Sequence, residues 1–223
     1  MNANREGYEP LFSSKEGLFL LAEELKQPLT AIAQSAEINH DAVITRQARQ
    51  ALQTIDGILI GEQIAHGQRH LTLQPLHVGS VMTDVSRDMQ STILSRHVRA
   101  QLQLKRGLSL IDADRTVLQH LLKSIWGVML AMTDKASEPE IAFSAKQTRF
   151  GVRISLKSPS VDLSGLQVSH FKADSTQPLR QLAGSGADML VALQLNSLLR
   201  SKMTLSKHSI SVTLAPSTQL ALV

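Results

Sequence analysis

Apolar positions near the start of the chain recur at steps of three and four residues, the spacing of one helix face. They are Leu18, Leu21, Leu25, Leu29, Ile32 and Ala36. A second run with this spacing, which should end near Gly67, comprises Ile44, Ala48, Ala51, Ile55 and Leu59. Asp41, in the intervening Asn-His-Asp turn, is the expected N-cap of the second helix. Residues 15–70 are therefore predicted to form an antiparallel helical hairpin after a flexible N-terminus, residues 1–14.

The spacing of apolar positions changes after the hairpin. Alternating apolar positions predict short strands at 71–73 (ended by Pro75), 98–104, 108–110, 141–143, 152–156, 203–205 and 210–214. Helical spacing predicts three more helices, at about 78–93, 115–132 and 187–199, and Asp112 or Asp114 is the expected cap of the second of them. The stretch 158–183 is irregular. The predicted fold class is α+β, with a two-layer α/β sandwich over residues 71–223 after the hairpin.

The amino-acid composition excludes several classes of function. The chain has no cysteine, which excludes disulfides, thiolate metal sites and thiol nucleophiles. The net charge of +4 is spread along the sequence, and aromatic residues are only 3% of it, so nucleic acid is not the expected partner. No apolar run is long enough for a signal peptide or a membrane span, so we expect no membrane segment in this chain and a cytoplasmic protein.

Residues 22–32 read A-E-E-L-K-Q-P-L-T-A-I and resemble the first-helix motif of sensor histidine kinases, S-H-E-L-R-T-P-L-T-A-I. Glu23 stands where that family carries its phosphorylated histidine. The resemblance covers about residues 15–220, although only 24–32 is specific. It implies a hairpin that dimerises into a four-helix bundle, followed by an ATPase-like domain of the GHKL, or Bergerat, fold. Autophosphorylation and phosphotransfer through position 23 are excluded.

The nucleotide motifs of that family are degraded here. In the helix that begins near Asp114, Val128 stands at the magnesium-binding asparagine and Ser124 at the preceding asparagine. Valine offers no oxygen to a hard cation, and Ser124 lies about one turn away. Ser158 stands at the adenine-reading aspartate; Asp162 with Gly165 could replace it only if the strand register were shifted.

The glycine-rich motif keeps Gly184 and Gly186 but has Asp188 where the family has a glycine. A carboxylate in the first turn of a helix suits the helix dipole and repels a phosphate. Residues 171–183 resemble a remnant of the family's ATP lid. ATP and magnesium binding are therefore predicted to be absent or weak. We expect no other metal site, since none of the eight histidines has a recognisable metal spacing, and His40, His66, His70 and His120 are each expected to be exposed and unpaired.

The first helix retains other features of the family motif. Glu24 matches the acid linked to hydrolysis of a phospho-aspartate, and Gln27, on the same helix face, replaces the water-positioning Thr or Asn. Glu23, Lys26 and Pro28 are the expected docking surface for a partner, and Pro28 should kink the helix because it cannot donate to the carbonyl of Glu24.

The resulting hypothesis is a degenerate histidine kinase, or pseudokinase, acting as a homodimeric docking or regulatory module in two-component signalling. Its partner would be a response-regulator receiver domain or another kinase. Two alternatives stay open: a response-regulator phosphatase that uses Glu24 and Gln27, and a diverged kinase that still binds ATP. The sequence does not identify the partner, the signal or the pathway.

Overall fold

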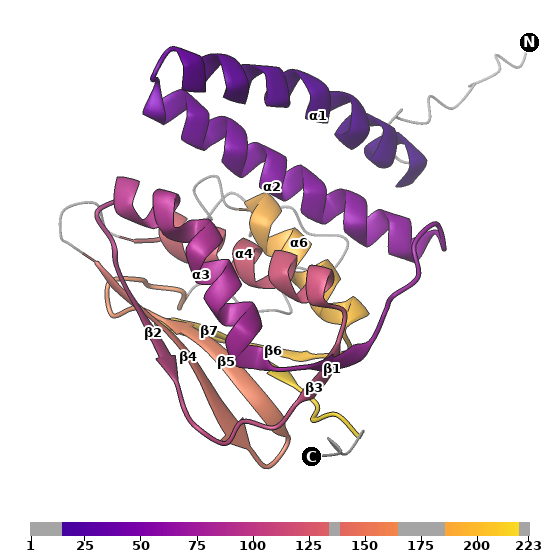
Figure 1. Ribbon diagram of the computed structural model, residues 1–223, viewed down its shortest axis with the longest axis vertical. Coiled ribbons are helices and arrows are strands. Elements are labelled where there is room, and N and C mark those ends of the chain that lie inside the picture. Colours follow the sequence, from indigo (N-terminus) through magenta and orange to yellow (C-terminus); the bar gives the residue numbers. More distant parts are fainter. Residues whose placement is uncertain (1–14, 134–138, 165–185, 219–223) are drawn as a thin grey trace, which may run out of the picture.

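A computed structural model describes residues 15–133, 139–164 and 186–218. Helices α1 (Lys15–Ile38) and α2 (Ala42–Ala65) form the expected antiparallel hairpin (Figure 1). The Asp41 carboxylate caps α2, accepting hydrogen bonds from the backbone N–H groups of Val43 and Ile44 at 3.0 Å. Pro28 lies inside α1, so the carbonyl of Glu24 lacks its usual helical donor. The 1–14 segment lies outside the described residues.

The rest of the described chain forms one α/β domain, here defined as everything from β1 onward. Its strands are β1 (Gln74–Leu76), β2 (Arg99–Leu104), β3 (Ile111–Ala113), β4 (Glu140–Thr148), β5 (Gly151–Lys157), β6 (Lys202–Ser206) and β7 (Ser209–Leu214), and its helices are α3 (Val78–Ser95), α4 (Arg115–Ala131) and α6 (Gly186–Leu198). Five strands form one sheet in the order β2-β4-β5-β7-β6, in which only β2 and β4 are parallel. The three helices cover one face of this sheet, as the two-layer prediction requires (Figure 1).

The helical layer buries the apolar positions that the sequence pattern assigned to it. Helix α4 is central, with Leu118, Leu121, Leu122, Ile125 and Met129 buried between the sheet and the other helices. Asp114 is its N-cap and accepts a hydrogen bond from the backbone N–H of Val117 at 3.1 Å. No helix in the described part of the chain is long and apolar enough to cross a membrane.

Two strand predictions were wrong in detail. Pro75 does not end a strand; it lies in the middle of β1, opposite Asp112 of β3. Proline is tolerated there because β1 pairs on one side only, so no ladder partner needs its missing N–H. The expected strand at 108–110 begins later, at Ile111, since pairing with β1 starts there.

Candidate functional site

The motif residues of α1 lie on the surface of the hairpin. Glu23, Glu24, Lys26, Gln27 and Pro28 are all exposed. Within the described residues, neither Glu24 nor Gln27 makes a hydrogen bond through its side chain, and one helical turn places both on the same face. Both groups are therefore available to a partner.

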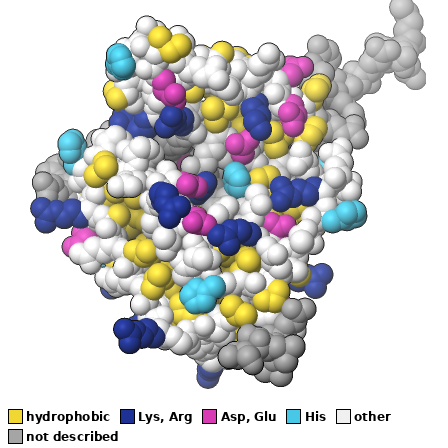
Figure 2. All heavy atoms as spheres, viewed as in Figure 1, with side chains coloured by type: hydrophobic (Ala, Val, Ile, Leu, Met, Phe, Trp, Pro, Cys, Tyr) yellow, Lys and Arg dark blue, Asp and Glu magenta, His cyan; other side chains and the backbone are white. Residues whose placement is uncertain are grey.

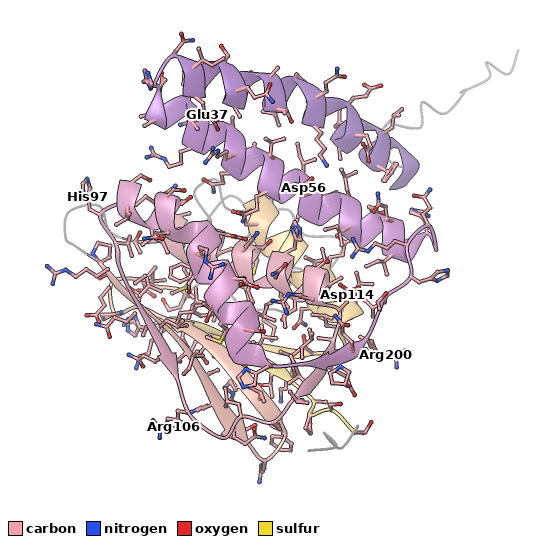
Figure 3. The ribbon with its side chains drawn as sticks, in the orientation of Figure 1. Glu37, Asp56, His97, Arg106, Asp114 and Arg200 are labelled. Atoms are coloured by element: carbon pink, nitrogen blue, oxygen red, sulfur yellow. The ribbon has the colours of Figure 1, made fainter. Side chains whose placement is uncertain are left out.

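Lys26 is tied to the second helix of the hairpin. Its Nζ lies 2.8 Å from Oδ1 of Asp56 on α2, a residue marked in Figure 3. This hydrogen bond is the main cause of a raised Lys26 pKa, to which the charges of Asp56 and Glu23 also contribute. The sequence suggested a free cation for docking, whereas the structure gives an exposed ion pair.

The two α4 positions that the resemblance aligns with the family's asparagines are inside the protein. Val128 and Ser124 of α4 are both buried, with Val128 part of the main apolar core. The neighbouring Gly127 faces the hairpin side of α4 and is covered by Asp188 of α6, since a Cβ on Gly127 would collide with that carboxylate.

Asp188 joins the two parts of the chain. It is 3% exposed, and its Oδ1 accepts a hydrogen bond from Oγ1 of Thr54 on α2 at 2.7 Å. A longer contact of 3.4 Å reaches its Oδ2 from Nε2 of Gln50, also on α2. Burial raises the pKa of the Asp188 carboxyl, and the hydrogen bonds from Thr54 and Gln50 oppose that rise. Sequence reasoning placed this carboxylate correctly in the first turn of a helix but missed its partners, which lie more than 130 residues away along the chain.

The hairpin packs closely on the α/β domain beside this carboxylate, where α2 crosses α4 and α6 (Figure 1). A Cβ on Gly57 would lie 2.5 Å from Cγ1 of Val191, and one on Gly61 would lie 2.6 Å from Cδ of Gln194. Glycines one turn apart on α2 thus allow α6 to approach its backbone. At the same contact, Nε2 of Gln194 donates to Oε1 of the buried Glu62 at 2.8 Å.

A small cavity lies among the described residues at this junction. This cavity, of about 100 Å³, lies between α2, α3 and α4, bordered by Gln50, Arg96 and Gly127. Ligand pockets are usually roughly 300–1,000 Å³. The cavity has room for a few water molecules rather than for a nucleotide.

The remaining nucleotide-motif residues are placed as follows. Ser158 comes directly after β5 and is fully buried, its backbone N–H donating to the carbonyl of His208 at 2.9 Å. Asp162 is exposed and accepts a hydrogen bond from the backbone N–H of Ser164 at 2.9 Å, an arrangement local to that turn. Gly186 begins α6, whereas Gly184 and the lid-like stretch 171–183 lie outside the described residues.

His120 is a residue whose environment sequence reasoning missed. It was expected to be exposed, yet its ring is partly buried on α4, and its Nδ1 is buried without a hydrogen-bond partner. Burial is the main reason why its pKa falls to about 4, with Lys123 contributing. His66 also differs from expectation, since its Nε2 lies 3.4 Å from Oε2 of Glu62. No cluster of His, Asp or Glu in the described part of the chain could hold a metal ion.

Acidic and basic side chains are interspersed on the face where the hairpin meets α3 and α4 (Figure 2). Besides Lys26 with Asp56, Nζ of Lys123 on α4 lies 2.6 Å from Oδ2 of Asp88 on α3. The junction is thus bordered by ion pairs on both the hairpin side and the domain side.

No family model matches the chain, and no curated protein matches its sequence. Solved structures do match its fold. Full-length ShkA in complex with AMPPNP matches with a TM-score of 0.60 and 16% identity over 92% of this chain, which spans about half of that protein, 47%. The histidine kinase AdeS of Acinetobacter baumannii matches with a TM-score of 0.57 and 11% identity, over 87% of this chain and 98% of that one.

The cytoplasmic segment of the histidine kinase QseC matches with a TM-score of 0.52 and 7% identity, over 74% of this chain and 95% of that one. Identities this low speak for the fold alone. The chain therefore has the fold of a sensor histidine kinase core, a helical hairpin followed by a GHKL-type α/β domain.

Proposed function

We propose that the chain is a degenerate histidine kinase core that acts as a dimeric docking module in two-component signalling. The observation that carries this proposal is the buried Asp188 carboxylate, which lies over Gly127 and is hydrogen-bonded to Thr54 of the hairpin. In the resemblance drawn from sequence, Asp188 replaces a phosphate-approaching glycine, and Gly127 precedes the lost magnesium ligand. A buried carboxylate and a packed helix there both oppose a bound triphosphate.

Loss of the nucleophile supports the same proposal. Glu23 cannot accept a phosphoryl group as histidine does, and it lies exposed on α1 beside the Lys26–Asp56 ion pair. The chain would then bind a receiver domain, or another kinase, without transferring phosphate. Glu23, Lys26 and Pro28 form the proposed docking surface.

Exposed leucine and isoleucine side chains on α1 support a homodimer. Leu25 and Ile32 are 43% and 46% exposed, and their seven-residue separation places them on one side of the helix. Ile55 and Leu59 of α2, by contrast, already pack against Ala22 inside the hairpin. The proposed dimer contact therefore centres on α1.

Thermal unfolding with and without millimolar magnesium-ATP tests the loss of nucleotide binding. A ligand that binds only the native state adds about 2.7 kcal/mol of stability at a hundredfold excess over its dissociation constant. We expect no saturable shift in midpoint beyond that given by magnesium chloride at the same ionic strength. A saturable rise in the unfolding midpoint that magnesium-ATP gives and magnesium chloride does not would overturn the proposal and favour the diverged kinase.

A second candidate function, a phospho-aspartate phosphatase, is favoured by the exposure of Glu24 and Gln27 on one helix face. Receiver domains charged with acetyl phosphate provide the substrate. Gln27→Ala should abolish the added dephosphorylation, while Gln34→Ala, an exposed glutamine two turns along the same helix, should preserve it. Equal decay rates with the wild type and Gln27→Ala eliminate this candidate.

Docking is tested by measuring the affinity of the same receiver domains for two variants of this chain. Lys26→Gln and Asp56→Asn both remove the ion pair, but only the first removes a positive charge from the docking surface. We expect weaker binding for Lys26→Gln alone, most clearly at low salt, where charges are least screened. Equal effects of the two changes would mean that the ion pair matters only for the hairpin itself.

A further inference from the structure

The five-stranded sheet has a second face that no described helix covers. Helices α3, α4 and α6 all lie on one side of the sheet (Figure 1). Successive side chains along a strand point to opposite faces. The buried Phe143 and Ile154 therefore belong to the helical face, and Ser144 and Ser155, which are partly exposed, belong to the other face. We call this other face the open face; it carries no residue of the α1 motif and none of the nucleotide motifs.

Strand register brings three basic side chains into one row across the open face. Lys146 of β4 lies opposite Arg153 of β5. In the same row, Thr213 of β7 lies opposite both Arg153 and Lys202 of β6. Within the described residues, neither Lys146 nor Lys202 has a carboxylate partner, while Nε of Arg153 donates to Oγ1 of Thr213 at 3.3 Å. Like charges directly opposite each other destabilise a sheet, so the Lys146–Arg153 pair lowers stability unless an anion lies over it.

The next row on the open face consists of hydroxyl groups. Its members lie on the same four strands and are Ser144, Ser155, Ser211 and Thr204. Oγ of Ser155 donates to Oγ of Ser211 at 3.0 Å. One row further, Lys157 of β5 lies opposite Ser209 of β7. Because the uncharged side chains in these rows are short, the longer basic side chains reach beyond them, and the open face presents cations over a flat layer of hydroxyl groups.

Acidic side chains are almost absent from the open face. Among the five described strands of the sheet, the one carboxylate is that of Glu140, which lies opposite Arg99 of β2. These two charges offset each other, and four cations remain: Lys146, Arg153, Lys157 and Lys202. The aspartates of α3 and α6 lie on the helical side of the sheet. Basic residues that are spread along the sequence are thus gathered on one surface, to which an anionic partner is complementary.

An exposed aromatic side chain lies at the border of the open face. Phe150, in the turn between β4 and β5, is 63% exposed, and Cζ of Arg149 lies 4.5 Å from the centroid of its ring. Basic and aromatic side chains together are typical of surfaces that bind the membrane interface. Nucleic-acid sites instead place aromatic rings where bases can stack, or insert a helix or strands into a groove. The strands carry no aromatic side chain on the open face, so its chemistry favours a lipid surface.

We propose that the open face binds the surface of a membrane that contains anionic lipids. Its four cations would contact lipid phosphate and carboxylate groups, the hydroxyl groups of the second row would donate to the same oxygens, and Phe150 would lie among the head groups. A planar lipid surface fits a flat sheet face because several strands can touch it at once. The contact is peripheral, and it does not depend on the docking function proposed for α1.

Co-sedimentation of the whole chain with lipid vesicles tests this proposal. We expect binding to phosphatidylcholine vesicles that contain about 30% phosphatidylserine, weaker binding as salt is added, and none to phosphatidylcholine alone. Lys146→Gln and Lys202→Gln should each lower the partition coefficient about fivefold, the equivalent of about 1 kcal/mol for one cation at an anionic surface. Arg87→Gln, which removes an exposed cation from α3 on the helical side, should leave binding unchanged. Equal losses for Lys146→Gln and Arg87→Gln, or equal binding to both kinds of vesicle, overturn the proposal.

A fluorescent reporter separates a lipid contact from other anionic partners. The chain has a single tryptophan, Trp126, which is buried, so Phe150→Trp adds an indole whose emission should shift to shorter wavelength only with the phosphatidylserine vesicles. Lys146→Gln removes a like-charge contact, so its unfolding midpoint should not fall below that of the wild type, and its lost binding then has a local cause. An unshifted emission on bound vesicles, or tighter binding to duplex DNA than to vesicles at the same salt concentration, would refute the membrane as the occupant.

Discussion

Acidification should destabilise the protein through His120. The ring lies on α4 among charges from every element around it: Lys123 on α4, Asp56 on α2, Arg69 after α2 and Lys26 on α1. Burial lowers the pKa of His120 most, the three cations lower it further, and Asp56 alone opposes them. The neutral ring is therefore favoured in the folded state.

The size of the effect follows from the pKa values. A histidine whose folded pKa is below its unfolded value stabilises the protein above the unfolded pKa and loses that stability as pH falls. For His120 this loss occurs as the pH falls from 6.5, the ordinary pKa of histidine, to the folded pKa of about 4. The full difference is worth about 3 kcal/mol, of which about 2 kcal/mol disappears between pH 7 and pH 5.

Urea unfolding at pH 7 and pH 5 measures this loss. His120→Phe keeps a ring of similar shape and removes a nitrogen, Nδ1, that has no hydrogen-bond partner, so it should be tolerated and should lose about 2 kcal/mol less than the wild type on acidification. Other titrating groups cancel in this comparison. His70→Phe, at an exposed histidine, controls for the change in composition. If the wild type and His120→Phe lose equal stability between the two pH values, the assigned environment of His120 is wrong.

Three further outcomes are expected. Because burial raises the pKa of Asp188, the carboxyl destabilises the fold least below pH 3.8 and destabilises it more as the pH rises through its folded pKa. The stability of Asp188→Asn relative to the wild type should therefore increase from pH 4 to pH 8. A constant difference between the two proteins in urea titrations would contradict this. Gly57→Ala should destabilise by about 1–3 kcal/mol despite the better helix propensity of alanine, and combining it with Val191→Ala should recover part of that loss, since the colliding Cγ1 is then absent. Leu25→Glu with Ile32→Glu should yield monomers in light scattering, because the dimer contact would have to bury both charges; a monomeric wild type at micromolar concentration would remove the basis for this expectation.

Sequence reasoning succeeded where the determinants are local. The caps at Asp41 and Asp114 and the buried sides of α3 and α4 follow from spacing within one element. It failed where a distant partner decides. The partners of Asp188 lie on α2. The burial of His120, and the charges of Asp56 and Lys26 near it, depend on the hairpin, and only Lys123 is close to it in the sequence. The strand containing Pro75 was missed because its pairing depends on which strand lies beside it.

Asp114 also fixes the connection between the two parts of the chain, at the point labelled in Figure 3. Its Oδ1 caps α4 through Val117 and lies 3.7 Å from Nη2 of Arg69, while its Oδ2 accepts the backbone N–H of Thr72 at 3.1 Å. The connector after α2 therefore does not let the hairpin rotate freely about the α/β domain. Turning the hairpin about this point would pull on the carboxylate that stabilises the first turn of α4, by about 1 kcal/mol for a typical cap. A partner that twists the hairpin would therefore transmit mechanical strain directly into the central helix of the α/β domain.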